Sequence, residues 1–282
     1  MTAVCSPGDA VAKPFCKWVG GKRQLLTHIL PRVPESFGQY HEPFVGGGAV
    51  FFALASGRAG SHPGMRANLS DTNERLVRTY RGIQHDVDAV VRRLGTYRHD
   101  RDFFNRVREM DIDPRSDAEV AAWLVYLNKT GYNGLYRVNS KNRFNVPFGD
   151  YKNPLFLDED NLRACAGALA AATVRCEDFD KVAERAQRGD FVYFDPPYVP
   201  LSATSSFTSY TSDGFGIDEQ RRLRDLALAL KKRGVKVLLS NSSAPAVHEL
   251  YERGFTIHTA FASRSINCKP GGRGRIAELL IE

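Results

Sequence analysis

Short apolar strand candidates alternate with helical segments along much of the chain, and this alternation limits the possible folds. Strands are expected over residues 40–45, 67–71, 174–176, 191–194, 235–240, 256–261 and 276–281. Segments with helical apolar spacing lie between them, at residues 49–55, 218–233 and 244–253. This order of elements predicts an α/β protein with a doubly wound sheet.

One strand candidate ends in an unusual tetrapeptide. The apolar run at residues 191–194 is followed directly by Asp195, Pro196, Pro197 and Tyr198. The two prolines restrict the backbone and remove two N–H donors, which leaves a carboxylate and a backbone carbonyl as acceptors beside a flat ring. Two acceptors and a stacking surface suit an exocyclic amine on a planar base. An ordinary Pro-Pro turn after a strand is the alternative.

A second strand candidate, at residues 40–45, leads into three consecutive glycines at 46–48 and then a helix. Glycine lets a ligand approach the backbone closely, and Asp71, at the end of the next strand, is placed to bind ribose hydroxyls. The G-x-G-x-x-G pattern of dinucleotide sites is missing, and Arg23 stands where a P-loop needs Ser or Thr. A ligand with a ribose and no phosphate fits better, and S-adenosylmethionine is such a ligand.

Composition narrows the class of protein. The 282 residues are 43% hydrophobic, and 39 basic against 32 acidic residues give a net charge of +7, which favours an anionic partner such as nucleic acid. The five cysteines are scattered without a C-x-x-C pair, so we expect reduced thiols and no metal site. No signal peptide and no run of ~18 apolar residues is present. We therefore expect a soluble cytoplasmic protein with no membrane contact. A monomer is also expected, but not from these features.

The pattern changes in the middle of the chain, where we expect an inserted, mostly helical lobe. Residues 73–108 are rich in arginine, residues 120–127 form an apolar helical segment, and residues 128–151 are rich in Asn, Gly and Tyr. Eight arginines supply positive charge here: Arg75, Arg78, Arg92, Arg93, Arg98, Arg101, Arg106 and Arg108. We expect a subset to contact phosphates; a solvated helical face is the alternative for most of them.

In combination, these motifs resemble the Dam family of DNA adenine-N6 methyltransferases, the D12 class with the α motif order. The resemblance covers nearly all of residues 13–282. It is carried by residues 17–22 (KWVGGK), 43–48 (PFVGGG), 127–137 (LNKTGYNGLYR), 144–149 (FNVPFG), 195–198 (DPPY), 200–204 (PLSAT) and 264–266 (RSI). The glycine motif departs slightly, because the family often has Ala or Cys where Gly47 stands.

The resemblance implies a Rossmann-like sheet of the S-adenosylmethionine-dependent methyltransferases, with residues 13–74 and 154–282 as the catalytic domain and residues 75–153 as the target-recognition domain. It implies these cofactor-binding residues: Trp18, Lys22, Phe44, Gly46, Gly48, Asp71, Asp178 and Asp195. For Asp178 the adjacent Glu177 remains an alternative. It implies these DNA-binding residues: Lys17, Tyr132, Asn133, Leu135 and Arg137. Localisation at the nucleoid would follow from binding double-stranded DNA.

The expected reaction is methyl transfer to N6 of adenine by Asp195, Pro196, Pro197 and Tyr198. Asp195 and the Pro196 carbonyl accept the two N–H bonds of the amine, and Tyr198 stacks on a base that has been flipped out of the duplex. A loop at residues 199–215 is expected to close over that base; a flexible spacer is the alternative.

The expected target sequence is GATC. Arg137 is expected on guanine, Leu135 against the thymine methyl group, and Tyr132 as a wedge in the base stack. A β-hairpin with structural aromatic residues is the alternative for this segment.

Three other functions stay open at this point. An RNA or protein amide N-methyltransferase would keep the chemistry, although such enzymes commonly have Asn as the first residue of the tetrapeptide. A catalytically idle DNA-binding relative would have lost some of the residues at 46–48, Asp71 and Asp195. A nicotinamide dehydrogenase would need the missing glycine fingerprint.

Overall fold

The computed structural model describes residues 11–56, 62–199, 215–263 and 275–282. Its contacts divide the chain into two compact units, each made of several segments. The first unit comprises Met1–Gly21, Gly46–Met65 and Asp71–Cys176, and the second comprises Lys22–Val45, Arg66–Ser70 and Glu177–Glu282. The expected closing loop at residues 199–215 and the motif segments 200–204 and 264–266 lie wholly or largely outside the described residues.

Six of the seven strands in the described part of the chain belong to the second unit, apart from Asp71 at the end of β2. Their order across the sheet is β2 (Ala67–Asp71), β1 (Tyr40–Glu42), β4 (Phe191–Phe194), β5 (Lys236–Ser242), β7 (Arg275–Ile281) and β6 (Ile257–Ser263). The first four of these strands pair in parallel, whereas β7 runs antiparallel to both β5 and β6. The predicted α/β fold is therefore confirmed.

The strand before the tetrapeptide is at the centre of this arrangement. All four residues of β4 are buried, and β1 and β5 pair with its two edges. A parallel strand covered on both faces needs a continuous apolar run and not an alternating one. The sequence Phe-Val-Tyr-Phe meets this need and holds the following Asp195 at the carboxyl end of the sheet.

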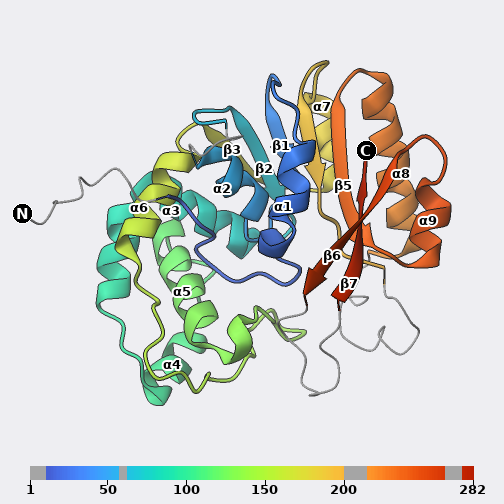
Figure 1. Ribbon diagram of the computed structural model, residues 1–282. Helices are drawn as coiled ribbons and strands as arrows, with labels where there is room; N and C mark the ends of the chain where they lie inside the picture. The colour runs from blue at the N-terminus through green and yellow to red at the C-terminus, as the bar shows by residue number, and fades with distance from the viewer. Residues whose placement is uncertain (1–10, 57–61, 200–214, 264–274) are drawn as a thin grey trace, which may run out of the picture. The chain divides into compact units, whose positions relative to one another are not determined.

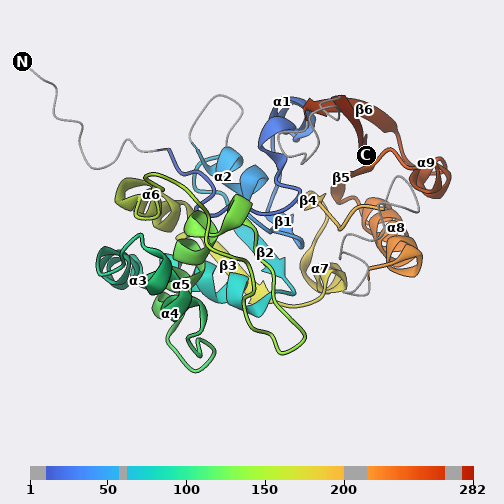
Figure 2. The ribbon, with the colours of Figure 1, turned by 90° about the horizontal axis from the view of Figure 1, so that it is seen from below.

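The described part of the second unit also contains helices. They are α1 (Leu26–Ile29), α7 (Val182–Arg185), α8 (Ile217–Lys232) and α9 (Pro245–Tyr251), with 3-10 turns η1 (Lys22–Gln24), η2 (Leu30–Arg32) and η4 (Phe179–Lys181). Figure 2 shows α8 beside α9. Leu223 and Leu230 form an apolar stripe on α8 and pack in one core with Phe194 of β4 and Tyr251 of α9.

The first unit is mostly helical over its described residues. It contains α2 (Ala49–Ala55), α3 (Glu74–Gly95), α4 (Arg101–Arg108), α5 (Asp117–Thr130), the 3-10 turn η3 (Tyr132–Gly134), α6 (Glu159–Leu169) and the strand β3 (Ala172–Cys176). Figure 1 shows α3 and α5 packed along each other. Side-chain caps start both helices: Asn73 accepts a hydrogen bond at the beginning of α3, and Ser116 with Glu119 forms a capping box on α5.

Gly82 allows the close packing of α3 on α5. A Cβ atom at this position would lie 2.3 Å from the carbonyl oxygen of Asp117. We expect Gly82→Ala to lower the free energy of unfolding by about 1–3 kcal/mol, because the backbone cannot move aside cheaply. Gly95→Ala on the same helix meets no atom within 4 Å and is the control. Urea unfolding tests this; an equal midpoint for the two variants would contradict the close approach.

None of the described helices has the length and apolar character required to cross a membrane.

Candidate active site and DNA-binding residues

The carboxylate of Asp195 is held from two sides within the second unit. The Lys22 Nζ lies 2.7 Å from Asp195 Oδ1, and the Ser240 hydroxyl of β5 donates a hydrogen bond to the same oxygen at 3.0 Å. Burial raises the pKa of Asp195, while the Lys22 ammonium and the Ser240 hydrogen bond oppose that shift. Because both contacts fall on Oδ1, Oδ2 is the oxygen that can accept a hydrogen bond from a ligand amine.

Hydrogen bonds from buried side chains fix the backbone after Asp195. Gln220 of α8 donates from Nε2 to the Pro197 carbonyl at 2.8 Å, and Asn241 of β5 donates to Gln220 Oε1 at 2.9 Å. Both amide side chains belong to buried residues. Since the Pro197 carbonyl is bound to Gln220, the carbonyl of Pro196 is the one that fits the predicted second acceptor for an amine.

The ring of Tyr198 is also held at two points. Its hydroxyl donates to Glu278 Oε2 of β7 at 2.6 Å, and the Lys22 Nζ lies 4.6 Å from the ring centroid. We call Lys22, Asp195, Tyr198, Ser240 and Glu278 the Asp195 cluster. The sequence analysis named Lys22, Asp195 and Tyr198, and the structure places Lys22 against Asp195. The sequence analysis did not single out Ser240 or Glu278, because both lie on strands without a recognisable motif.

Two further predicted cofactor residues lie in the second unit near η4. The Phe44 ring stacks on Phe179 with centroids 5.3 Å apart. Asp178 caps η4 and lies 3.3 Å from the Arg222 guanidinium, with 46% of its side chain exposed. The neighbouring Glu177 is paired with Arg185 and is only 18% exposed. Of the two acids considered, Asp178 is therefore the more accessible.

The first unit brings together Trp18, the glycine turn and Asp71. Gly46 and Gly48 have positive φ angles of 46° and 68°, and a Cβ atom at Gly46 would lie 2.8 Å from Trp18 Cδ1. Asp71 Oδ2 accepts a hydrogen bond from the Gly46 N–H at 3.1 Å, and Oδ1 accepts one from the Asn73 N–H at 2.9 Å. Burial raises the pKa of Asp71, and these backbone hydrogen bonds oppose the shift.

Trp18 also contacts the segment predicted to bind DNA. Its ring stacks on Tyr136 with centroids 5.4 Å apart and an interplanar angle of 25°. Tyr136 interacts with Arg75, whose guanidinium donates two hydrogen bonds to Asp113 and one to the Asn142 carbonyl. The sequence analysis did not single out Tyr136; its position between the predicted base contacts Leu135 and Arg137 was the available signal.

Asn128, near the end of α5, joins Lys17 to the turn η3. Its side chain accepts from the Lys17 N–H at 2.7 Å and donates to the carbonyls of Lys17 and Gly134 at 2.8 and 2.7 Å. Asn128 is fully buried, so a single amide orders two predicted DNA-binding segments. Tyr132 at the start of η3 is 50% exposed.

The remaining predicted base contacts follow η3. Asn133 has a positive φ of 56°, Leu135 is half-buried, and Arg137 is exposed. The Arg137 Nε donates to Asn145 Oδ1 at 2.7 Å, and the Asn145 N–H donates to the Arg137 carbonyl at 3.0 Å. An exposed arginine with one neutral partner keeps donors available for another acceptor.

Four of the eight arginines considered for phosphate contacts pair with carboxylates inside the first unit: Arg75, Arg78, Arg93 and Arg108. Arg75 is buried and paired with Asp113, and the Arg78 Nε lies 2.6 Å from Asp117 Oδ1. These guanidinium groups join α3 to the segment before α5 and to its first residue. With only 8% of its surface exposed, Arg75 is poorly placed to belong to the subset of arginines expected to contact phosphates.

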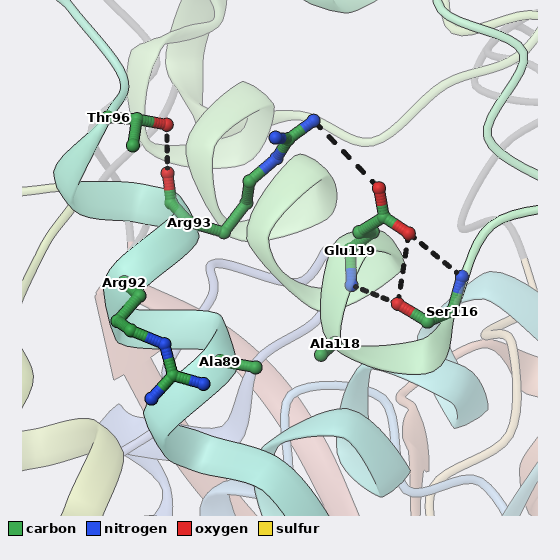
Figure 3. A pocket seen from close by; sticks show the side chains of 7 residues that line it. All are labelled: Ala89, Arg92, Arg93, Thr96, Ser116, Ala118 and Glu119. Atoms are coloured by element: carbon green, nitrogen blue, oxygen red, sulfur yellow. Dashed lines mark hydrogen bonds and ion pairs between the residues drawn. The ribbon is translucent and has the colours of Figure 1, made fainter.

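A surface hollow of about 300 Å³ lies between α3 and α5 (Figure 3). Its hydroxyl groups cap the C-terminus of α3 and the N-terminus of α5. Thr96 Oγ1 donates to the Arg93 carbonyl at 2.7 Å, and Ser116 bonds to Glu119 in the capping box. The Arg93 guanidinium lies 3.9 Å from Glu119. The hollow therefore has a structural explanation; of the candidate phosphate-contacting arginines it includes Arg92 and Arg93, and it includes none of the predicted cofactor or base-contacting residues.

Sequence comparison identifies the class of protein to which this fold and these motifs belong. Residues 18–266 match the family described as D12 class N6 adenine-specific DNA methyltransferase. The chain belongs to this family, and the predictions of the family and of the enzyme class are confirmed. Members of such methyltransferase families use S-adenosylmethionine, and DNA is their substrate. The α/β sheet described for the second unit is consistent with that fold.

Relatives of similar length cover nearly the whole chain. The Type II methyltransferase M1.LlaDCHI of Lactococcus lactis subsp. cremoris is 43% identical over 277 residues, 95% of this chain and 94% of the relative. The Type II methyltransferase M.MjaIII of Methanocaldococcus jannaschii is 42% identical over 288 residues, 95% and 98% of the two chains. The DNA adenine methylase of Escherichia coli (strain K12) is 35% identical over 272 residues, 95% and 94%.

Proposed function

We propose that the protein transfers a methyl group from S-adenosylmethionine to N6 of adenine in duplex GATC sites, after the base has been flipped out. The arrangement around Asp195 supports this most directly. One carboxylate oxygen is held by Lys22 and Ser240, which leaves the other for the N6 amine, and the Pro196 carbonyl can accept the second N–H. Family membership argues against an RNA- or protein-directed methyltransferase and against a dehydrogenase.

The residues of the Asp195 cluster would act on the amine. The N6 lone pair of adenine is delocalised into the ring, so N6 is a weak nucleophile. Two acceptors, Asp195 Oδ2 and the Pro196 carbonyl, would draw the nitrogen toward a tetrahedral geometry and localise the lone pair on it. When the N–C bond forms, N6 loses one proton, which the Asp195 carboxylate can accept. Pro197 would hold the loop through its bond to Gln220, and Tyr198 would stack on the base.

The residues around the glycine turn fit a nucleoside without a phosphate. When bound, S-adenosylmethionine supplies the methyl group on a sulfonium and leaves as a neutral thioether. A carboxylate oxygen can accept more than one hydrogen bond, so Asp71 can still accept ribose hydroxyls beside its backbone amide partners. Trp18, Gly46 and Gly48 adjoin that acid in the first unit. Lys22, Phe44, Asp178 and Asp195 of the second unit remain the other proposed cofactor residues.

DNA recognition is assigned to the segment after α5. We assign Arg137 to guanine O6 and N7, Leu135 to the thymine methyl group and Tyr132 to a wedge in the base stack. The exposure of Tyr132 and Arg137 supports these roles. Asn133 and Lys17 would contact the DNA nearby, since Asn128 orders both segments.

The functional division into a catalytic domain (residues 13–74 and 154–282) and a recognition domain (residues 75–153) is likewise proposed. It groups residues by role, whereas the two compact units group them by contact, and the bounds differ.

Nucleoside mass spectrometry tests the proposed function. DNA free of methylated adenine is incubated with the protein and S-adenosylmethionine, using duplexes that contain or lack GATC. We expect N6-methyladenine only in the GATC duplex. Methylation of both duplexes would refute the roles of Leu135 and Arg137 and keep the reaction. No methylated base in either, with DNA binding intact, would identify a catalytically idle relative.

Lowering the pH is expected to reduce the activity. This loss should begin at a higher pH than it would if Asp195 had the pKa of an ordinary aspartate. Burial raises the pKa of Asp195 above 3.8, and only the ionised carboxylate can take up the N6 proton. Lys22 opposes that shift, so Lys22→Met should raise the pKa further and move the acidic limb of kcat/KM to higher pH. Measuring kcat/KM between about pH 4 and pH 8 covers the range in which such an acid titrates. If Lys22→Met left the acidic limb of the kcat/KM profile at the wild-type pH, the assignment of that limb to Asp195 would be contradicted.

The same shift has a consequence for stability. Because the folded pKa of Asp195 exceeds the unfolded one, the contribution of this group to stability is fully present at low pH and is lost as the pH rises through the folded pKa.

A further inference from the structure

Glu278 is an acidic residue within an otherwise apolar stretch of β7. The next three residues, Leu279, Leu280 and Ile281, are fully buried, and Glu278 itself is half-buried. An acid among buried apolar residues needs a partner. The partner is Tyr198, whose hydroxyl donates to Glu278 Oε2 at 2.6 Å.

The antiparallel pairing of β5 with β7 places Glu278 opposite Ser242. The Ser242 hydroxyl donates to the carbonyl of Val199 at 2.7 Å. Two residues paired across β5 and β7 therefore hold two consecutive residues of the loop: Ser242 holds the Val199 backbone, and Glu278 holds the Tyr198 side chain.

The Tyr198 ring is oriented by contacts at its end and over its face. Glu278 fixes the hydroxyl, and the Lys22 ammonium lies over the ring, 4.6 Å from its centroid. With both contacts made, the side chain has lost most of its rotational freedom before any ligand arrives. A ring that is already oriented loses less entropy when a base stacks on it.

A carboxylate at position 278 opposes the ionisation of Asp195, whereas a neutral side chain would not. The negative charge of Glu278 raises the pKa of Asp195 and so disfavours the ionised form that the reaction requires. A neutral acceptor would satisfy the Tyr198 hydroxyl without this effect. The stronger hydrogen bond that a charged acceptor makes is the compensating gain.

We propose that Glu278 is a positioning residue for methyl transfer: through its hydrogen bond to the hydroxyl, it holds the Tyr198 ring in the orientation at which the flipped adenine stacks. This inference rests on the proposed function, in which Tyr198 stacks on the target base. It extends that function to β7, where no motif marks a functional residue.

Four variants test the proposal: Glu278→Ala, Glu278→Gln, Tyr198→Phe, and the double variant of Glu278→Ala with Tyr198→Phe. Glu249→Ala, an exposed acid on α9, is the matched control. We expect Glu278→Ala to lower kcat about five- to tenfold, part of the loss expected for removing a base–aromatic stack. KM for DNA and for S-adenosylmethionine should stay within about twofold, since positioning acts after binding. Glu278→Gln should restore most of the activity, because its amide oxygen still accepts the hydrogen bond.

The double variant and a base-stacking signal separate positioning from a general structural effect. If Glu278 acts through the hydroxyl, Tyr198→Phe should lower kcat to the same degree, and the double variant should lose no more than either single variant. The fluorescence of 2-aminopurine at the target position reports stacking of the flipped base, and it should increase in Glu278→Ala and Tyr198→Phe.

Some outcomes would overturn the inference. An unchanged kcat in Glu278→Ala, losses that multiply in the double variant, or a lower kcat with unchanged 2-aminopurine fluorescence would each do so. Absence of methylation by the wild-type protein would instead refute the proposed function on which the inference rests. Circular dichroism of each variant shows whether it is folded. Tyr198→Phe leaves Glu278 in place, so a lower kcat in this variant with a wild-type spectrum reports mispositioning and not unfolding.

Discussion

Asp195→Ala is expected to lower the rate of N6-methyladenine formation by at least about 10³-fold, within the range that a positioned acid–base group contributes. The variant removes one of the two acceptors that localise the N6 lone pair and the group that takes up the proton. The rate is measured under single-turnover conditions by nucleoside mass spectrometry, so that product release does not mask the chemical step.

Two comparisons make the Asp195 result interpretable. Asp225→Ala removes an aspartate whose side chain is 64% exposed on α8 of the same unit, and it should keep wild-type activity. Asp195→Asn keeps the shape and one oxygen acceptor but loses the charge, so it should remain nearly inactive. Activity above about a hundredth of the wild-type rate in Asp195→Ala would contradict this role, since a positioned acid–base group contributes at least about 10²-fold.

The Asp195 variants also require a stability measurement. The Lys22 side chain is only 5% exposed and lies 2.7 Å from the Asp195 carboxylate. Removing one partner of a buried ion pair can cost about 3–5 kcal/mol. Urea unfolding at the assay temperature shows whether the Asp195 variant is folded. If the variant is unfolded, the double variant of Asp195→Asn with Lys22→Met is used instead, because it removes both charges of the ion pair.

Gly48→Ala is expected to weaken S-adenosylmethionine binding by at least about tenfold, equivalent to about 1.4 kcal/mol, and to destabilise the first unit. Gly48 has a φ of 68°, and a Cβ atom would lie 2.5 Å from the Tyr80 hydroxyl. That hydroxyl donates to the Gly46 carbonyl at 3.0 Å, so moving Tyr80 disturbs the turn next to Asp71. Left-handed backbone strain of about 1–2 kcal/mol and overpacking of about 1–3 kcal/mol add together.

Gly64→Ala is the matched control for this prediction. Gly64 has a similar φ of 74°, but a Cβ atom there would meet nothing within 4 Å. It should therefore show the backbone strain alone and bind S-adenosylmethionine normally. Isothermal titration calorimetry measures the affinity, and urea unfolding measures the stability. Normal affinity in Gly48→Ala would mean that the glycine turn does not contribute to the cofactor site.

Several elements could be predicted closely from local sequence. The strands at residues 67–71 and 191–194 and the helix at residues 49–55 have the predicted bounds. Apolar runs ended by glycine, proline or a carboxylate indicate such elements because backbone preference and burial act over a few residues. The contact of Asp71 with the glycine turn could also be expected, since consecutive parallel strands end at the same edge of a sheet.

The pairing of the last two strands could not be predicted in the same way. The pattern indicated strands near residues 256–261 and 276–281, but β7 lies between β5 and β6 and runs antiparallel to both. An apolar run specifies a buried strand without specifying its neighbour. This pairing brings Glu278 to Tyr198, which is 80 residues earlier in the chain.

Sequence by itself determined the family, the order of strands and helices, and the identity of Asp195 and Tyr198 as candidate catalytic residues, because these depend on short motifs and local apolar spacing. Tertiary structure alone decided which oxygen of Asp195 is held by Lys22 and Ser240, and which acid holds Tyr198. It also decided that Arg75 is buried against Asp113. Such partners are chosen by the packing of strands and helices distant in the chain, where burial requires each charge to be matched by whichever group the fold brings beside it.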